Sequence, residues 1–294
     1  MNNWLERQKN LSFDDFDEAI KETIRRIKPL EERRDEEQTI ERLKATYQAL
    51  KKHDTTEKEP GQWGWIPKSI INDDRKRVSS QAYGLLVVLA MNATIPPIAN
   101  GRKIVPRTTP TVILRWLGLT NSNRRPLIAQ LLGELEDAEI IKQNGEDIEL
   151  LFPTMDEAKD KDNGGIGQGG FVKLYVSTYQ AILDRSHGIA TLNRLAVYLG
   201  FRYNIFEAAK GAPNRAVWLE GGELIPWVVD LSYNAANNNL KWLRENGVLS
   251  WNLIQNANKY HNKKYLITEH FHVREMVMNL CYWLLGGSVV RVLA

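Results

Sequence analysis

An internal repetition constrains the fold of this 294-residue chain more than any other feature of its sequence. Four apolar pairs share one offset of 108 residues: Leu132/Leu240, Leu135/Leu243, Ile140/Val248 and Ile141/Leu249. In both copies a Leu-x-x-Leu stripe has the spacing of a helix face, and the apolar pair after it is typical of a strand. A polar turn and a second apolar strand follow. We therefore expect one structural unit to occur twice.

The segments ahead of these stripes also correspond. Residues 112–117 and 228–231 each precede a turn rich in Asn, Ser or Ala, and residues 82–91 and 192–201 have the pattern of amphipathic to fully apolar helices. Each half reads as helix, short helix, turn, longer helix and two-stranded hairpin, with Asn144-Gly145 as a turn signal. This order is typical of a helix-turn-helix followed by a β-hairpin wing. We predict a mainly α chain with small β-hairpins, an α+β fold with two winged-helix domains. Two generic α+β domains with a chance periodicity are the alternative.

Composition divides the chain into four parts. Residues 156–170 are acidic and then glycine-rich, which indicates a flexible linker. We expect winged-helix domain 1 over 60–155 and winged-helix domain 2, with a C-terminal helix, over 171–294. Residues 1–59 combine a narrow apolar stripe with charges of both signs, so they are expected to form a charged helical arm that pairs with a second copy in a homodimer. A solvated, partly disordered tail is the alternative.

Charge is segregated along the chain, although the net value is only +3. Residues 60–131 carry a net charge of +8, and residues 132–164 carry −8. A strongly basic block is the electrostatic footprint of binding to a phosphate backbone, so double-stranded DNA is the expected partner. Alternatively, the acidic block only neutralises the basic block within one domain.

The second helix of a helix-turn-helix lies in the major groove, and its first turns meet the base edges. Arginine can pair with guanine and asparagine with adenine. In the first copy the side chains at these positions are Asn121, Ser122, Asn123, Arg124 and Arg125. In the second copy they are Asn234, Asn237, Asn238, Asn239, Lys241 and Arg244. Capping of the helix and solvation of the loop are the alternative explanation for so many asparagines.

Further basic side chains are expected to contact phosphates. In the first half these are Arg75, Lys76, Arg77, Arg102, Lys103 and Arg107. At the tip of the second hairpin, the side chains expected at phosphates or in a minor groove are Asn258, Lys259, Lys263 and Lys264. The first hairpin tip, 145–147, is acidic and should avoid DNA. The two copies are therefore expected to dock differently.

No catalytic, metal or cofactor site is expected. Residues 165–170 match G-x-G-x-x-G, but a dinucleotide-binding loop needs a strand before it and a helix after it. His270 and His272 form a His-x-His pair, but a nicking enzyme also needs a tyrosine on a helix beyond that pair, and only Tyr282 follows. The histidines and the single cysteine have no zinc spacing. Tryptophans at apolar-periodic positions, Trp227 among them, are assigned to the core.

The single cysteine, Cys281, excludes an internal disulfide and fits a reducing compartment. The apolar stretches fall short of the ~20 residues of a membrane helix. The N-terminus becomes charged at once, so a signal peptide is not expected. We therefore expect a cytoplasmic protein with no membrane partner.

Two stretches carry a resemblance to a known family. One is Ile66-Pro67-Lys68-Ser69-Ile70-Ile71, and the other is the run 79–86 ahead of the helix-turn-helix and wing. Over about 65–270 the arrangement resembles the tandem winged-helix replication initiators of plasmids. The resemblance implies binding to direct repeats in an origin, recruitment of host replication proteins, and no catalytic residue. A transcriptional repressor of a mobile element or phage operon, and a primosome or partition scaffold, are the two other hypotheses.

Overall fold

The computed structural model describes residues 62–95, 101–119, 122–154, 170–205, 216–220, 224–256, 263–269 and 289–292. These residues form helices and small antiparallel sheets. The expected arm, 1–59, all of the expected linker except Gly170, and residues 270–288, where the expected C-terminal helix falls, lie outside them. No helix among these residues is long and apolar enough to cross a membrane.

The first half of the chain contains a three-stranded sheet that is built around a hairpin. Its elements are β1 (Trp63–Pro67), α4 (Lys68–Asn72), a 3-10 turn (Asp74–Lys76), α5 (Ser80–Asn92), β2 (Lys103–Val105), α6 (Pro110–Trp116), a second 3-10 turn (Ser122–Arg124), α7 (Arg125–Asp137), β3 (Ile141–Asn144) and β4 (Asp147–Leu150). Strand β4 lies between β2 and β3, and Ile148 faces Val105 on one side and Gln143 on the other. The hairpin therefore folds back onto the strand that precedes α6.

The second half repeats this arrangement. Its elements are β5 (Phe171–Tyr175), α10 (Val176–Arg185), α11 (Ala190–Tyr203), β6 (Ala216–Glu220), α12 (Leu224–Val228), α13 (Tyr233–Glu245), β7 (Leu249–Asn256), β8 (Lys263–Glu269) and β9 (Val289–Val292). Strand β8 lies between β6 and β7, as β4 lies between β2 and β3, and β9 adds a fourth strand beside β7. Helices α7 and α13 begin 108 residues apart, and so do strands β3 and β7. The order that the sequence predicts for each half is thus present. The additional elements are a strand (β2 or β6) ahead of each short helix, a strand and a helix (β1 and α4, or β5 and α10) ahead of each central helix, and β9.

Local sequence explains where the main helices begin. The hydroxyl groups of Ser79, Thr109 and Ser232 accept hydrogen bonds from backbone amides in the first turns of α5, α6 and α13, at 3.3, 3.4 and 3.3 Å. Serine and threonine are favoured at this position because they satisfy an amide that has no partner within the helix. Pro110 opens α6, where a missing amide hydrogen does no harm.

The two halves meet in one continuous hydrophobic core. Strand β1 pairs antiparallel with β5, and Trp65 lies opposite Lys173. Helices α5 and α11 pack so closely that a Cβ atom added to Gly84 would lie 2.0 Å from the carbonyl oxygen of Leu192. Only a glycine permits that approach of two backbones. This explains why both segments read as almost fully apolar: each helix is enclosed by the other half as well as by its own.

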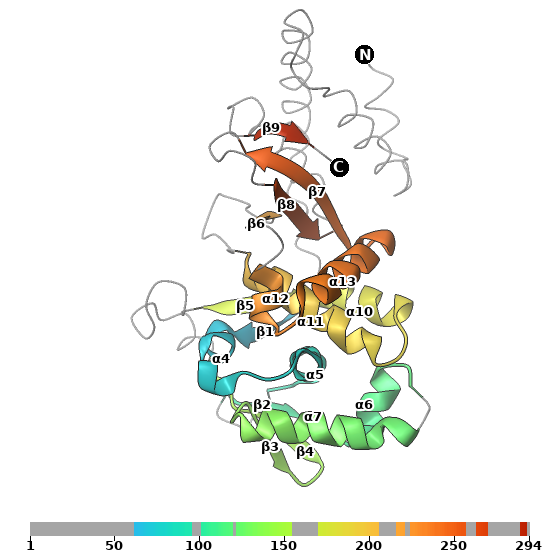
Figure 1. Cartoon of the computed structure of the whole chain (residues 1–294). Helices are drawn as coiled ribbons and strands as arrows, with labels where there is room; N and C mark the ends of the chain where they lie inside the picture. The colour runs from blue at the N-terminus through green and yellow to red at the C-terminus, as the bar shows by residue number, and fades with distance from the viewer. Residues whose placement is uncertain are drawn as a thin grey trace, which may run out of the picture.

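Figure 1 shows how this centre positions the rest of the molecule. Helices α5 and α11 lie in the middle, with hairpin β3–β4 at the bottom of the view and strands β7 and β8 towards the top. Helices α7 and α13 each lie between the centre and one hairpin. The division into two domains stays a prediction, to which the structure adds that both repeats share a core.

Candidate nucleic-acid interface

The exposed face of α13 carries most of the polar side chains that the sequence predicts for the second copy. Asn234, Asn238 and Lys241 are exposed and Asn237 is half-buried, whereas Ala236, Leu240 and Leu243 are buried on the opposite face. Of these inward-facing residues, Leu240 and Leu243 belong to the hydrophobic core. An outward row of amides and one lysine therefore remains for a partner.

Helix capping does not account for these asparagines. The cap of α13 is Ser232, and the asparagines follow it within the helix. Among the described residues, no hydrogen bond involves the side chains of Asn234, Asn237 or Asn238, whereas Asn239 donates to the carbonyl oxygen of Ala235 at 2.8 Å. Relative to alanine, Asn237 and Asn238, which lie beyond the first turn, cost roughly 1 kcal/mol of helix stability. A cost of this size without a local gain favours a role in binding.

The start of α7 presents a smaller polar set. Asn123, Arg124 and Arg125 are exposed, while Leu131 and Leu135 are buried on the inner face. Asn121 lies outside the described residues, and only the backbone of Ser122 is described, within the turn Ser122–Arg124. The two arginines lie at the junction of the 3-10 turn and α7 and are exposed to solvent, which is the position expected for contacts with DNA.

The basic run 75–77 lies where the two halves meet. Arg75 is exposed and pairs with Asp73 at 3.0 Å, which lowers the pKa of that carboxyl group below its usual value. The ammonium group of Lys76 lies 3.5 Å from the carbonyl oxygen of Glu139, just beyond the end of α7. Arg77 donates to the backbone carbonyl of Trp227. This run therefore contacts the end of α7 in its own half and α12 in the other half.

Trp227 is not a core residue, contrary to the expectation from its apolar-periodic position. The side chain is 55% exposed on α12, and the guanidinium group of Arg77 lies 5.2 Å from the centre of its ring. Helix α12 has only five residues, so its periodicity does not determine which face is covered. An exposed tryptophan beside arginines adds an aromatic surface to the basic run.

Lys103 is buried and therefore not available to a phosphate, contrary to the expectation from the sequence. The residue is only 7% exposed, and its ammonium group donates to the carbonyl oxygen of Trp65 at 3.3 Å and lies 4.2 Å from that ring. Burial lowers the pKa of Lys103 to about 8. The physical reason is strand alternation: Lys103 and Val105 of β2 both point inwards, whereas Ile104 between them does not.

The neighbouring arginines are differently placed. Arg102 is exposed and pairs with Glu149 at 2.7 Å. Arg107 is exposed, has a positive φ of 50°, and its backbone amide donates to the carboxylate of Asp147 at 2.8 Å. Both side chains stay accessible, but Arg102 is partly neutralised by its acidic partner.

Acidic residues of the block 132–164 have structural partners within the first half. Glu134 accepts hydrogen bonds from the backbone amide and the hydroxyl group of Ser79, so α7 holds the start of α5. Glu136 accepts from the backbone and side-chain amides of Gln143 at 2.8 and 2.7 Å and joins α7 to β3. The described residues of the acidic block therefore help to assemble this half. One of them, Glu149, pairs with Arg102, whereas Arg124 and Arg125 stay exposed.

The second hairpin is described only in part. Lys263 and Lys264 lie at the start of β8, and Asn258 and Lys259 lie outside the described residues. At the base of the hairpin, the guanidinium group of Arg244 lies 4.3 Å from the ring of Trp251. Lys241 pairs with Glu245 at 3.7 Å on the exposed surface, where such a pair is weak.

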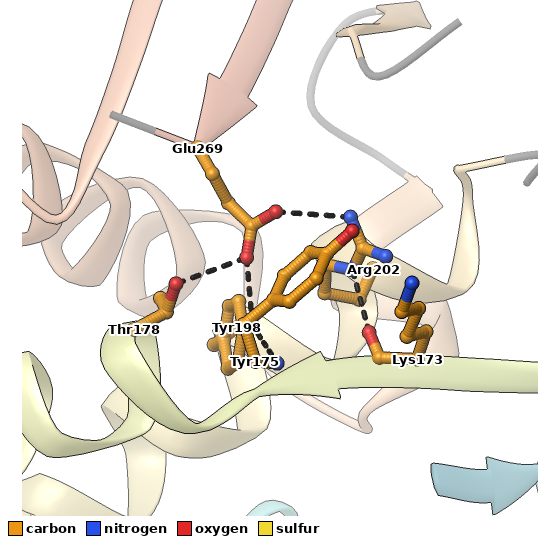
Figure 2. A network of polar contacts seen from close by, with 6 residues as sticks. All are labelled: Lys173, Tyr175, Thr178, Tyr198, Arg202 and Glu269. Atoms are coloured by element: carbon orange, nitrogen blue, oxygen red, sulfur yellow. Dashed lines mark hydrogen bonds and ion pairs between the residues drawn. The ribbon is translucent and has the colours of Figure 1, made fainter. Parts of the chain in front are cut away.

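A buried polar network fixes the second hairpin to the centre of the molecule (Figure 2). The carboxylate of Glu269, at the end of β8, accepts hydrogen bonds from Arg202 at 3.0 Å, Tyr198 at 2.7 Å and Thr178 at 3.0 Å. Arg202 also donates to the backbone carbonyl of Lys173 in β5 at 2.6 Å. Burial, reinforced by the Glu269 carboxylate, raises the pKa of Tyr198 well above its usual range. Sequence reasoning missed this network, since Arg202 and Glu269 are far apart in the chain and neither lies in a recognisable motif.

Within the described residues, no group of three or more His, Cys, Asp or Glu side chains is arranged to hold a metal ion. Comparison with known proteins adds no identification, since no family model, curated protein or solved structure matches this chain.

Proposed function

We propose that this chain is a sequence-specific double-stranded DNA-binding protein that uses two winged-helix units. The observation that carries the proposal is the outward row of Asn234, Asn238 and Lys241 on α13, which neither caps the helix nor packs in the core. Amide and ammonium groups in this position suit base edges and phosphates. The repeated order of helix, strand, helix, helix and hairpin supports two such units in one chain.

In this proposal α7 and α13 are the helices that enter the major groove. The contacts of the first unit come from Asn123, Arg124 and Arg125, and the run 75–77 binds phosphates. The hairpin of the second unit, which begins β8 with Lys263 and Lys264, adds phosphate contacts. The acidic tip of the first hairpin stays away from DNA, because a phosphate backbone repels carboxylates.

The biological setting that we favour is initiation of plasmid replication, at repeats in an origin and together with host replication proteins. It follows from the resemblance of residues 65–270 to tandem winged-helix initiators. A role as a scaffold that docks through the acidic block is less well supported, since Glu134, Glu136 and Glu149 are engaged within the chain.

The test is binding of the full chain to DNA from the flanks of its own gene, followed by footprinting. The double variant Arg124→Ala, Arg125→Ala should weaken specific binding by about 1–3 kcal/mol for each lost base contact. Lys142→Ala is the matched control, because it removes an exposed charge from β3 of the same unit but not from α7. Equal binding by the double variant and the parent would show that α7 does not read DNA.

The salt dependence of binding distinguishes phosphate contacts from base contacts. Each neutralised phosphate contributes a slope of about −0.9 to the plot of log K against log salt concentration. Arg75→Ala should reduce that slope with little effect on sequence preference. Binding that does not change with salt would contradict a DNA-binding role for the basic run.

A further inference from the structure

The proposed reading helices differ from each other at the positions that face outwards. With the offset of 108 residues, Asn234, Asn237, Asn238 and Lys241 of α13 correspond to Pro126, Ala129, Gln130 and Gly133 of α7. Pro126, Ala129 and Gln130 are exposed, and the space around the α carbon of Gly133 is open. Three of these four positions in α7 therefore offer no side-chain hydrogen bond.

The exposed amides of α13 have a geometry that suits one kind of base. Asn234 and Asn238 are one helical turn apart and are both exposed, with Lys241 close to the same line. An amide presents a donor beside an acceptor, which matches N6 and N7 of adenine but not the two acceptors of guanine. The four-residue spacing is a rise of about 6 Å, or roughly two base pairs of B-form DNA.

The α7 helix differs from α13 most clearly at its start. Its exposed arginines, Arg124 and Arg125, present only donors, which guanine accepts. Beyond them, Ala129 and Gly133 offer no hydrogen-bonding side chain, and Gln130 is an exposed amide at the position that corresponds to Asn238. The two units thus present different side chains at most equivalent positions, although their elements follow the same order.

We propose that the DNA site has two unlike halves, and that the half bound by α13 is defined by adenines that Asn234 and Asn238 contact through N6 and N7. The half bound by α7 is defined by guanine at the start of that helix. The inference rests on the proposed DNA-binding function and specifies its ligand more closely. One copy of the chain contains both reading helices. The DNA site that a single copy binds is therefore asymmetric in sequence.

The experiment is selection of duplexes from a random-sequence library with the full chain. The parent should enrich a site with adenines in one half and guanine in the other. Asn234→Ala with Asn238→Ala should abolish preference in the adenine half and leave the guanine half unchanged. Asn239→Ala is the matched control. Although the sequence predicts a base contact for Asn239, the structure takes it out of the outward row, because its side chain is half-buried and donates to the carbonyl of Ala235. This variant should keep both preferences.

A base analogue then tests the contact itself. Replacing the selected adenines by 7-deazaadenine removes the N7 acceptor without changing Watson–Crick pairing, and should weaken binding by the parent about tenfold per contact. The same replacement should have no effect on binding by the Asn234→Ala, Asn238→Ala variant. This non-additivity is a readout that a merely misfolded variant would not produce, because each protein is compared with itself on two duplexes.

The outcomes separate the inference from the function on which it rests. Failure to enrich any sequence would overturn sequence-specific binding itself. Enrichment of a site that lacks adenine in both halves, or that the double asparagine variant binds with unchanged preference, would overturn the inference and leave DNA binding in place.

Discussion

The close approach of the α5 and α11 backbones can be tested with one methyl group. Gly84 lies within α5, and a Cβ atom added there would be 2.0 Å from the Leu192 carbonyl oxygen and 2.6 Å from its carbon. Such contacts are backbone contacts, so rotation of a side chain cannot relieve them. Gly84→Ala therefore requires α5 and α11 to separate by about 1 Å before that distance reaches 3.0 Å.

The size of the expected loss of stability follows from the packing contacts between α5 and α11. A gap of about 0.5–1 Å forfeits a quarter to a half of the dispersion energy of each contact across it. Overpacking of a core typically costs about 1–3 kcal/mol, and a fixed backbone belongs at the upper end or beyond. Alanine regains about 1 kcal/mol of helix propensity. We expect a net loss of at least about 2 kcal/mol, or roughly 4–8 °C in Tm.

Two other helical glycines provide matched controls for the same substitution. The nearest atoms to a Cβ at Gly200 are Cγ2 of Ile225 at 3.1 Å and its backbone oxygen at 3.3 Å. Both need to move by only a few tenths of an ångström, so Gly200→Ala should change stability by no more than about 1 kcal/mol. A Cβ at Gly133 has nothing within 4 Å, so Gly133→Ala should stabilise the protein by about 0.5–1 kcal/mol. From the most stable to the least stable, we expect Gly133→Ala, the parent, Gly200→Ala with nearly the stability of the parent, and Gly84→Ala.

The assay is urea denaturation of the full chain, followed by circular dichroism, together with thermal melting. A Gly84→Ala variant as stable as the parent would refute the reasoning, because the two halves could not then be in backbone contact. A loss at Gly133 as large as that at Gly84 would refute it too, because the effect would follow from losing glycine rather than from the contact.

Three further variants test other parts of the fold. Glu269→Ala leaves the guanidinium of Arg202 buried without its carboxylate, and it should lower the free energy of unfolding in urea by about 3–5 kcal/mol. Adding Arg202→Met to the same chain should restore most of that loss. An unchanged free energy of unfolding in the single variant would contradict this prediction. Lys103 has its pKa lowered to about 8, so the unfolded chain binds more protons above that pH and the free energy of unfolding should rise from pH 8 towards pH 10. Lys103→Met should flatten that rise, and an unchanged pH profile refutes the assignment. Ser232→Ala removes the cap of α13 and should destabilise by about 1 kcal/mol by thermal melting, whereas an unaltered Tm argues against the cap.

Local periodicity predicted the repeated elements well. The leucines at positions 132, 135, 240 and 243 lie on the buried faces of α7 and α13, and the apolar pairs after them begin β3 and β7. These features depend on residues three or four apart, so they can be read from the chain directly. The exposure of Arg124, Arg125 and Asn238 follows from the same periodicity.

Side-chain placement in short segments could not be predicted in this way. Lys103 was expected at a phosphate, but a three-residue strand turns it inwards against Trp65. Trp227 was expected in the core, but it lies exposed on a five-residue helix. In both cases the element is too short to show a period, and its orientation depends on partners elsewhere in the chain.

The sequence by itself determined that one unit occurs twice, which face of each long helix is buried, and where the excess positive charge lies. Only the tertiary structure decided that β1 pairs with β5, that α5 and α11 meet at Gly84, and that Glu269 holds Arg202 inside the molecule. The physical reason is how far apart in the sequence the interacting residues lie. Helix faces and caps are set by neighbours within a few residues, whereas these contacts join segments that are brought together only when apolar surface from both halves is buried in one core.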